Sequence, residues 1–174
     1  IEVILFGLVL GSFLNVCIHR LPKNKTLGGR SACPKCQKQI AWYDNVPVFS
    51  YLILGGKCRH CKTAISFRYP FVELLTGFVS MLVYWRAGNL PEYFLWFLLF
   101  GAPLVVVTFI DFDEQIIPDI ISLPGIPIGV LVHLFGSWPM WKESLIDSGL
   151  GILVGGGSLL LISQLYYIIR KREG

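Results

Sequence analysis

Four cysteines in two Cys-x-x-Cys pairs are the residues best suited to chemistry in this sequence. Cys33 and Cys36 form the first pair, and Cys58 and Cys61 form the second. Each pair can supply two sulfurs to one tetrahedral ion, although the stretch between the pairs is slightly longer than in a typical zinc ribbon. The pattern predicts a structural zinc site, because four thiolates leave no open position for catalysis. Two disulfides are the alternative.

Acidic residues crowd a second segment, TFIDFDEQIIPD, at residues 108–119. Asp111 directly follows the apolar run LVVVTFI, and an acid at the hydrocarbon edge is a functional candidate because its placement there is costly. We therefore expect Asp111 to be partly buried and to act in general acid/base chemistry. We expect Asp113 and Glu114 on a solvated elbow. Asp119 is expected at the start of a helix, where a carboxylate suits the helix dipole.

Two pairs of glycines and one further acid lie within apolar segments. The pairs are Gly7 with Gly11 and Gly151 with Gly155, and this small-x-x-x-small spacing predicts close packing of helices. Glu73 lies near the start of an apolar segment. A charge that stabilises a helix terminus and a functional acid are both open interpretations of Glu73.

The composition is that of a membrane protein. Of the 174 residues, 54% are hydrophobic and only 15% are charged, and the mean hydropathy is +0.63. Ordinary soluble domains have about 25% charged residues. The net charge of +4 is too small to indicate nucleic acid, so we expect no nucleic-acid partner.

The apolar runs predict an all-α polytopic membrane protein with a small zinc-ordered domain between its first two helices. A spanning helix needs about 20 apolar residues. Five candidates lie at about 1–18, 70–85, 93–110, 120–136 and 148–169.

The distribution of Lys and Arg predicts the orientation of the spans. Ten of the 15 basic residues lie between Arg20 and Arg68, and Arg170, Lys171 and Arg172 are near the end of the chain. By the positive-inside rule both stretches are cytoplasmic, and five helices place them on the same side. The N-terminus then faces outward, and the acidic segment faces the cytoplasm. Because the cytoplasm is reducing, zinc is favoured over disulfides.

The sequence resembles the type IV prepilin peptidases, the bifunctional leader peptidase and N-methyltransferase family. The matching stretches are GSFLNVCIHRLP, the two cysteine pairs, GGKCRHCKTAISFRYPFVE and IDFDEQIIPD, in the order found in the family. The resemblance implies a multi-pass aspartyl protease of the bacterial inner membrane. It would cut the basic leader from prepilins or pseudopilins of type IV pili or type II secretion systems. It would then methylate the new N-terminus with S-adenosylmethionine.

The resemblance also implies roles for individual residues. Asp111 is a catalytic acid, because it stands seven residues before Pro118 in an Asp-x6-Pro motif. The family's second catalytic acid belongs to a Gly-x-Gly-Asp motif, which these 174 residues do not contain, so we expect it beyond Gly174. Gly55, Gly56 and Lys57 match a segment tied to S-adenosylmethionine. A simple turn before the second cysteine pair is the alternative for these three residues.

Three domains are expected from these matches. They are a transmembrane helix at 1–18, a cytoplasmic tetra-cysteine zinc domain associated with methyl transfer at 19–69, and an aspartyl peptidase domain at 70–174 that is incomplete at its C-terminus. The expected partners are a prepilin or pseudopilin and membrane lipid. The alternatives are a non-catalytic membrane scaffold whose zinc knuckle docks a cytoplasmic partner, and a protein with methyltransferase activity alone.

Overall fold

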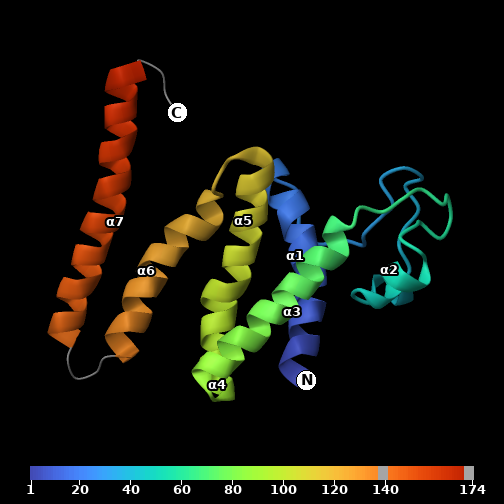
Figure 1. The fold of residues 1–174 in the computed structure, drawn as a ribbon, viewed down its shortest axis with the longest axis horizontal. Helices are drawn as coiled ribbons and strands as arrows, with labels where there is room; N and C mark the ends of the chain where they lie inside the picture. Colours follow the sequence, from blue (N-terminus) through green and yellow to red (C-terminus); the bar gives the residue numbers. More distant parts are fainter. Residues whose placement is uncertain (137–140, 171–174) are drawn as a thin grey trace. The chain divides into compact units, whose positions relative to one another are not determined.

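The computed structural model describes residues 1–136 and 141–170, and this part of the chain is helical, with no strands (Figure 1). This confirms the all-α prediction. The helices are α1 Glu2–Arg20, α2 Phe49–Ile53, α3 Arg68–Ala87, α4 Leu90–Trp96, α5 Ala102–Glu114, α6 Asp119–Gly136 and α7 Trp141–Arg170. Three shorter segments are the 3-10 turns η1 Leu21–Lys23 and η2 Trp42–Asn45 and the π-helical η3 Phe97–Gly101.

Within the described residues, three segments are long and apolar enough to cross a membrane by length and composition: Glu2–Lys23, Leu90–Glu114 and Leu145–Ile162. A shorter apolar helix runs over Asp119–Leu134. The predicted span at 70–85 coincides with α3, which is not among the three. Its polar residues Glu73, Thr76 and Ser80 are buried, so they lower its hydropathy while facing the protein interior.

Helices α1 and α3 lie against each other at glycines (Figure 1). A Cβ added to Gly7 would lie 2.8 Å from the Cα of Gly77, and one added to Gly11 would lie 2.8 Å from the Cα of Glu73. No side chain fits at these positions, so the packing predicted for the first glycine pair is confirmed. Gly151 and Gly155 differ, because an added Cβ would meet no described atom within 4 Å.

An apolar core joins α1, α3 and α5. Its buried members are Leu14, Cys17, Ile18, Val72, Ala102, Val105, Val106 and Ile110. Nearer the N-terminus of α1, the Ser80 hydroxyl lies 2.6 Å from the Val3 carbonyl and 2.7 Å from the Tyr93 hydroxyl. These contacts attach α3 to both α1 and α4.

Two capped turns determine where the helices of this core begin and end. Helix α3 ends at Gly88, whose φ of +75° favours glycine, and the Asn89 side chain accepts a hydrogen bond from the Glu92 amide at 3.0 Å. Segments α4, η3 and α5 then run on without a break to Gln115. The Gln115 amide donates to the Asp111 carbonyl at 2.9 Å, so this span ends within the acidic segment.

The chain forms two compact units, Ile1–Ile121 and Ser122–Gly174. The second unit holds most of α6 and all of α7. Pro124 and Pro127 lie inside α6, where each removes a backbone donor from the helix. Helix α7 begins at Trp141, several residues before the predicted span at 148–169.

Candidate functional site

The four sulfurs predicted to bind zinc come together in one cluster. The Sγ atoms of Cys33, Cys36, Cys58 and Cys61 all lie within 4.8 Å of one another, and those of Cys33 and Cys61 are 3.7 Å apart. All are free thiols rather than disulfides. Tetrahedral zinc with Zn–S bonds of about 2.3 Å separates its sulfurs by about 3.8 Å. The cluster therefore has the donor type, donor number and spacing that zinc requires.

The two halves of the cluster are built by the same backbone turn. In the first half, the Gln37 amide donates to the Cys33 carbonyl at 2.9 Å, and in the second the Lys62 amide donates to the Cys58 carbonyl at 3.0 Å. Both donor residues are left-handed, with φ of +57°. Each turn is flanked by an antiparallel bridge, Ala32 with Gln39 and Lys57 with Ala64. The two knuckles thus present paired thiols in equivalent ways.

The surroundings lower the pKa of two of the thiols and raise the pKa of a third. The nearby Thr63 hydroxyl, followed by the Thr63 amide, is the largest influence that lowers the pKa of Cys61 to about 6. Backbone amides, that of Cys36 above all, lower the pKa of Cys33. The Lys38 amide acts the same way on Cys36, but desolvation and the neighbouring thiols outweigh it and raise that pKa to about 11. A bound cation would be needed to keep the Cys36 thiol deprotonated at neutral pH.

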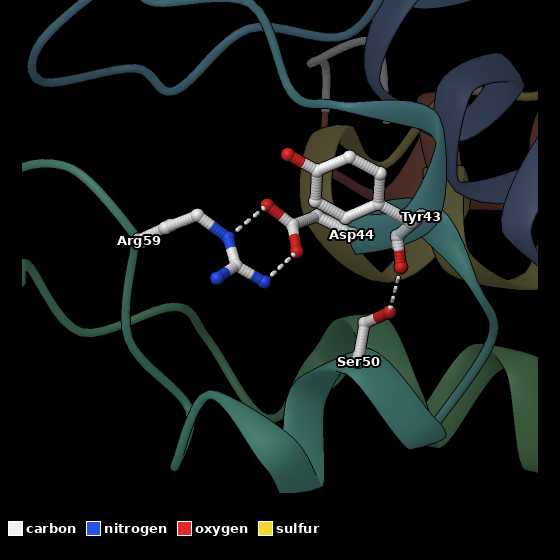
Figure 2. Close-up of polar contacts among 4 residues, drawn as sticks. All are labelled: Tyr43, Asp44, Ser50 and Arg59. Carbon is white, nitrogen blue, oxygen red and sulfur yellow. Dashed lines mark hydrogen bonds and ion pairs between the residues drawn. The ribbon is translucent and has the colours of Figure 1, made fainter.

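An ion pair ties the second knuckle to η2 (Figure 2). The Arg59 guanidinium donates from Nε to one Asp44 oxygen at 2.7 Å and from a terminal nitrogen to the other at 2.5 Å. It also lies 5.4 Å from the centre of the Tyr43 ring, and the Ser50 hydroxyl donates to the Tyr43 carbonyl at 2.9 Å. The hydrogen bonds from Arg59 hold the pKa of Asp44 below its usual value.

The segment proposed for S-adenosylmethionine forms a turn after α2. Gly55 and Gly56 have φ of +57° and +65°, a conformation that favours glycine. A Cβ on Gly56 would lie 2.9 Å from the Tyr51 ring and hydroxyl, whereas Gly55 faces open space. Lys57 is exposed. The turn by itself accounts for both glycines, and the open side of Gly55 and the Lys57 ammonium are the features available to a ligand.

One hydrogen bond attaches the loop around the cysteines to α3, and another joins α1 to the start of α3. A Glu73 carboxylate oxygen accepts from the Val48 amide at 2.7 Å, and the Asn15 side chain donates to the Tyr69 carbonyl at 3.0 Å. Val48 itself has φ of +60°, which is strained for a β-branched residue. Glu73 therefore holds a distant loop in place, which neither interpretation of the sequence had predicted.

Near the end of α5 the acidic segment has one paired carboxylate, Asp113, and two that have no partner among the described residues, Asp111 and Glu114. Arg68 donates from one terminal nitrogen to Asp113 at 2.6 Å and from the other to the Phe109 carbonyl at 3.2 Å, with its guanidinium 5.1 Å from the Phe109 ring centre. Asp113 is exposed, as predicted, and it is also paired with Arg68. Asp111, in the last turn of α5, has no hydrogen bond or ion pair with another described residue.

Asp111 is exposed rather than partly buried as predicted. The reason is the helical position, because the buried face of α5 is that of Val106 and Ile110, which pack in the core. Asp119 is the first residue of α6, as predicted. The sequence did not predict the role of Arg68, because its contact with Asp113 spans 45 residues and leaves no pattern in local spacing.

The fold and the cluster define a multi-pass helical membrane protein with a four-thiol segment suited to zinc. Residues 5–87 match the family model described as Bacterial Peptidase A24 N-terminal domain. The chain is 37% identical to the prepilin leader peptidase/N-methyltransferase of Pseudomonas aeruginosa, over 98% of this chain and 66% of that protein. The protein of the same name from Neisseria gonorrhoeae is 36% identical, over 97% of this chain and 66% of that protein.

A third relative, from Vibrio cholerae and with the same name, is 40% identical over 68% of this chain and 50% of its own length. The chain therefore belongs to the prepilin leader peptidase/N-methyltransferase family. It spans about two thirds or less of the length of these relatives. No solved structure gives a significant match.

Proposed function

We propose that this chain belongs to an enzyme of the bacterial inner membrane that removes the basic leader from prepilins or pseudopilins and N-methylates the new N-terminus. The observation that carries the proposal is the contact between Arg68 and Asp113. It places the acidic end of α5 beside the start of α3, at the end of the helices from which the basic cysteine segment extends.

The charge pattern supports a cytoplasmic location for this end of the helices. Ten Lys and Arg residues lie between Arg20 and Arg68, and such clusters are retained on the cytoplasmic side. The N-terminus then faces outward. A prepilin has a cytoplasmic leader followed by an apolar helix in the bilayer, so its scissile bond would lie at the same membrane face as Asp111.

Asp111 is the carboxylate best placed to act on that bond. It is exposed and unpaired among the described residues, whereas Asp113 is occupied by Arg68. Aspartyl proteolysis requires a second carboxylate that shares a proton with the first, and we assign that role to a Gly-x-Gly-Asp motif beyond Gly174. One acid would take a proton from the attacking water and the other would protonate the leaving amine, with no acyl-enzyme formed.

The cysteine segment would hold the residues proposed to bind S-adenosylmethionine in a fixed position. Zinc held by the four thiolates would order a stretch that has little apolar core of its own, because metal binding supplies folding free energy. Gly55, Gly56 and Lys57 would then be presented to S-adenosylmethionine, with the Lys57 ammonium meeting its carboxylate. A matched test is Lys57→Gln, which should weaken binding of S-adenosylmethionine while the zinc content stays at one per chain. Unchanged binding would remove Lys57 from the site.

The peptidase proposal is tested on the protein extended beyond Gly174, with Asp111→Asn and Asp113→Asn as a matched pair. Each variant is incubated with a prepilin and S-adenosylmethionine, and the intact mass of the substrate is measured. We expect Asp111→Asn to abolish leader removal and Asp113→Asn to retain a measurable rate. Full cleavage by Asp111→Asn would refute the peptidase role and favour a scaffold or a protein with methyltransferase activity alone.

A pilin that already lacks its leader separates the two activities. With this substrate, methylation by Asp111→Asn should equal that of the unmodified enzyme, because no peptide bond needs to be cut. A methyl mass shift that disappears together with cleavage would mean that the two reactions share Asp111.

A further inference from the structure

We propose that the cysteine segment docks on the surface of the anionic lipid bilayer through an apolar face formed by α2 and Trp42. Phe49, Leu52 and Ile53 are spaced at i, i+3 and i+4, so they share one side of α2. They are 59%, 67% and 81% exposed, and the side chain of Trp42, which lies seven residues before the start of α2, is 79% exposed. The proposal does not depend on the peptidase reaction.

The apolar side of α2 is turned outward by contacts on its other side. Ser50 is buried and its hydroxyl donates to the Tyr43 carbonyl. The Tyr51 hydroxyl donates to the Ile65 carbonyl at 3.3 Å, and its ring lies 6.3 Å from that of Phe67. The polar residues of α2 thus face the protein and its apolar residues face outward. This is the reverse of the usual arrangement in a soluble domain.

The attachment of α2 places this face close to the predicted bilayer boundary. The hydrogen bond from the Val48 amide to Glu73 holds the start of α2 beside the second turn of α3. Glu73 lies within the predicted span at 70–85. Phe71 and Leu74, on either side of Glu73 in α3, are exposed as well.

The charge of the same segment favours an anionic surface over other occupants. Residues 20–68 contain ten Lys and Arg residues and one acid, Asp44, which Arg59 already pairs. Basic residues next to a membrane are attracted by anionic lipid headgroups, and Trp prefers the interface. A basic prepilin leader would be repelled by this segment, which leaves lipid as the occupant that fits both the apolar face and its charge.

The proposal is tested with the full chain carrying Trp42 as its only tryptophan, the other four being changed to phenylalanine, in nanodiscs that contain anionic lipid. Lipids brominated near the headgroup quench a tryptophan that lies among them. We expect the Trp42 fluorescence to be roughly twofold lower in brominated than in plain nanodiscs, with little quenching by aqueous iodide. Equal fluorescence in the two lipids, with strong iodide quenching, would overturn the proposal.

A variant with Phe49, Leu52 and Ile53 all changed to serine should lose most of the quenching by brominated lipid. Its zinc content, measured in parallel, must stay at one per chain to show that the segment is still folded. Undiminished quenching in a zinc-loaded variant would show that this face is not the docking surface. A second copy of the chain as the occupant would instead make Trp42 fluorescence depend on the number of chains per nanodisc, and it too would overturn the proposal.

Discussion

Replacement of Gly11 by alanine tests the close approach of α1 and α3 directly. The added Cβ would lie 2.8 Å from the Glu73 Cα and 3.0 Å from the Thr76 Cβ. Ordinary contact begins at 3.4 Å, so the helices must separate by about 0.6 Å. The nearest atom belongs to a backbone, which cannot rotate away as a flexible side chain can.

The free-energy cost of this overpacking is partly offset by the higher helix propensity of alanine. Overpacking of this kind typically costs about 1–3 kcal/mol. Alanine in place of glycine inside a helix returns about 1 kcal/mol. We therefore expect Gly11→Ala to lower the free energy of unfolding by up to about 2 kcal/mol. The separation would also disturb Glu73 and its hydrogen bond to the Val48 amide, so the cysteine segment should loosen.

The assay is unfolding of the purified chain in mixed micelles with increasing mole fraction of sodium dodecyl sulfate, followed by circular dichroism. Gly151→Ala is the matched control, because its added Cβ would meet no described atom within 4 Å. It should be neutral or slightly stabilising. If Gly11→Ala behaves like Gly151→Ala, the two helices are not in backbone contact at Gly11 and the reasoning fails.

Three further predictions concern the site. Cys58→Ser should reduce bound zinc, measured by elemental analysis, from one per chain to well below one. If disulfides held the segment instead, the unmodified chain would keep its structure when a chelator is added. Arg68→Lys should lower kcat for leader removal less than Arg68→Ala does. The lysine ammonium can still pair with Asp113, but it cannot also reach the Phe109 carbonyl. Equal rates for the unmodified protein and the two variants would show that Arg68 does not position α5. The hydrogen bonds from Arg59 lower the pKa of Asp44 in the folded protein. Asp44 therefore stabilises the fold above the ordinary pKa of a free Asp, and this stabilisation is lost as the pH falls through the lower folded pKa. Asp44→Asn should therefore be less stable than the unmodified chain at pH 7 and should converge with it in acid, as followed by Trp42 fluorescence.

The features that depend on local pattern could be predicted from the sequence. Long apolar runs locate the helices, and the two Cys-x-x-Cys pairs give the four-thiol cluster. The close packing at Gly7 and Gly11 also follows from spacing alone. These predictions succeed because residues a few positions apart determine each feature.

The features that were missed all join distant residues or depend on helical angle. Arg68 binds Asp113 across 45 residues, and Val48 binds Glu73 across 25. No local spacing encodes either pair. The exposure of Asp111 was mispredicted because depth in the membrane says nothing about which side of α5 the carboxylate lies on.

The π-helical segment η3 determines the direction in which Asp111 points. In an α-helix each residue advances the side chains by about 100° around the axis. The wider turn at Phe97–Gly101 accommodates an extra residue, so it rotates everything after it relative to α4. Deleting one residue from η3 would restore a regular α-helix and swing Asp111 by roughly 100° around the axis of α5. The side of α5 on which Asp111 lies is thus set by a local change of helical pitch that ends ten residues earlier, inside the membrane span.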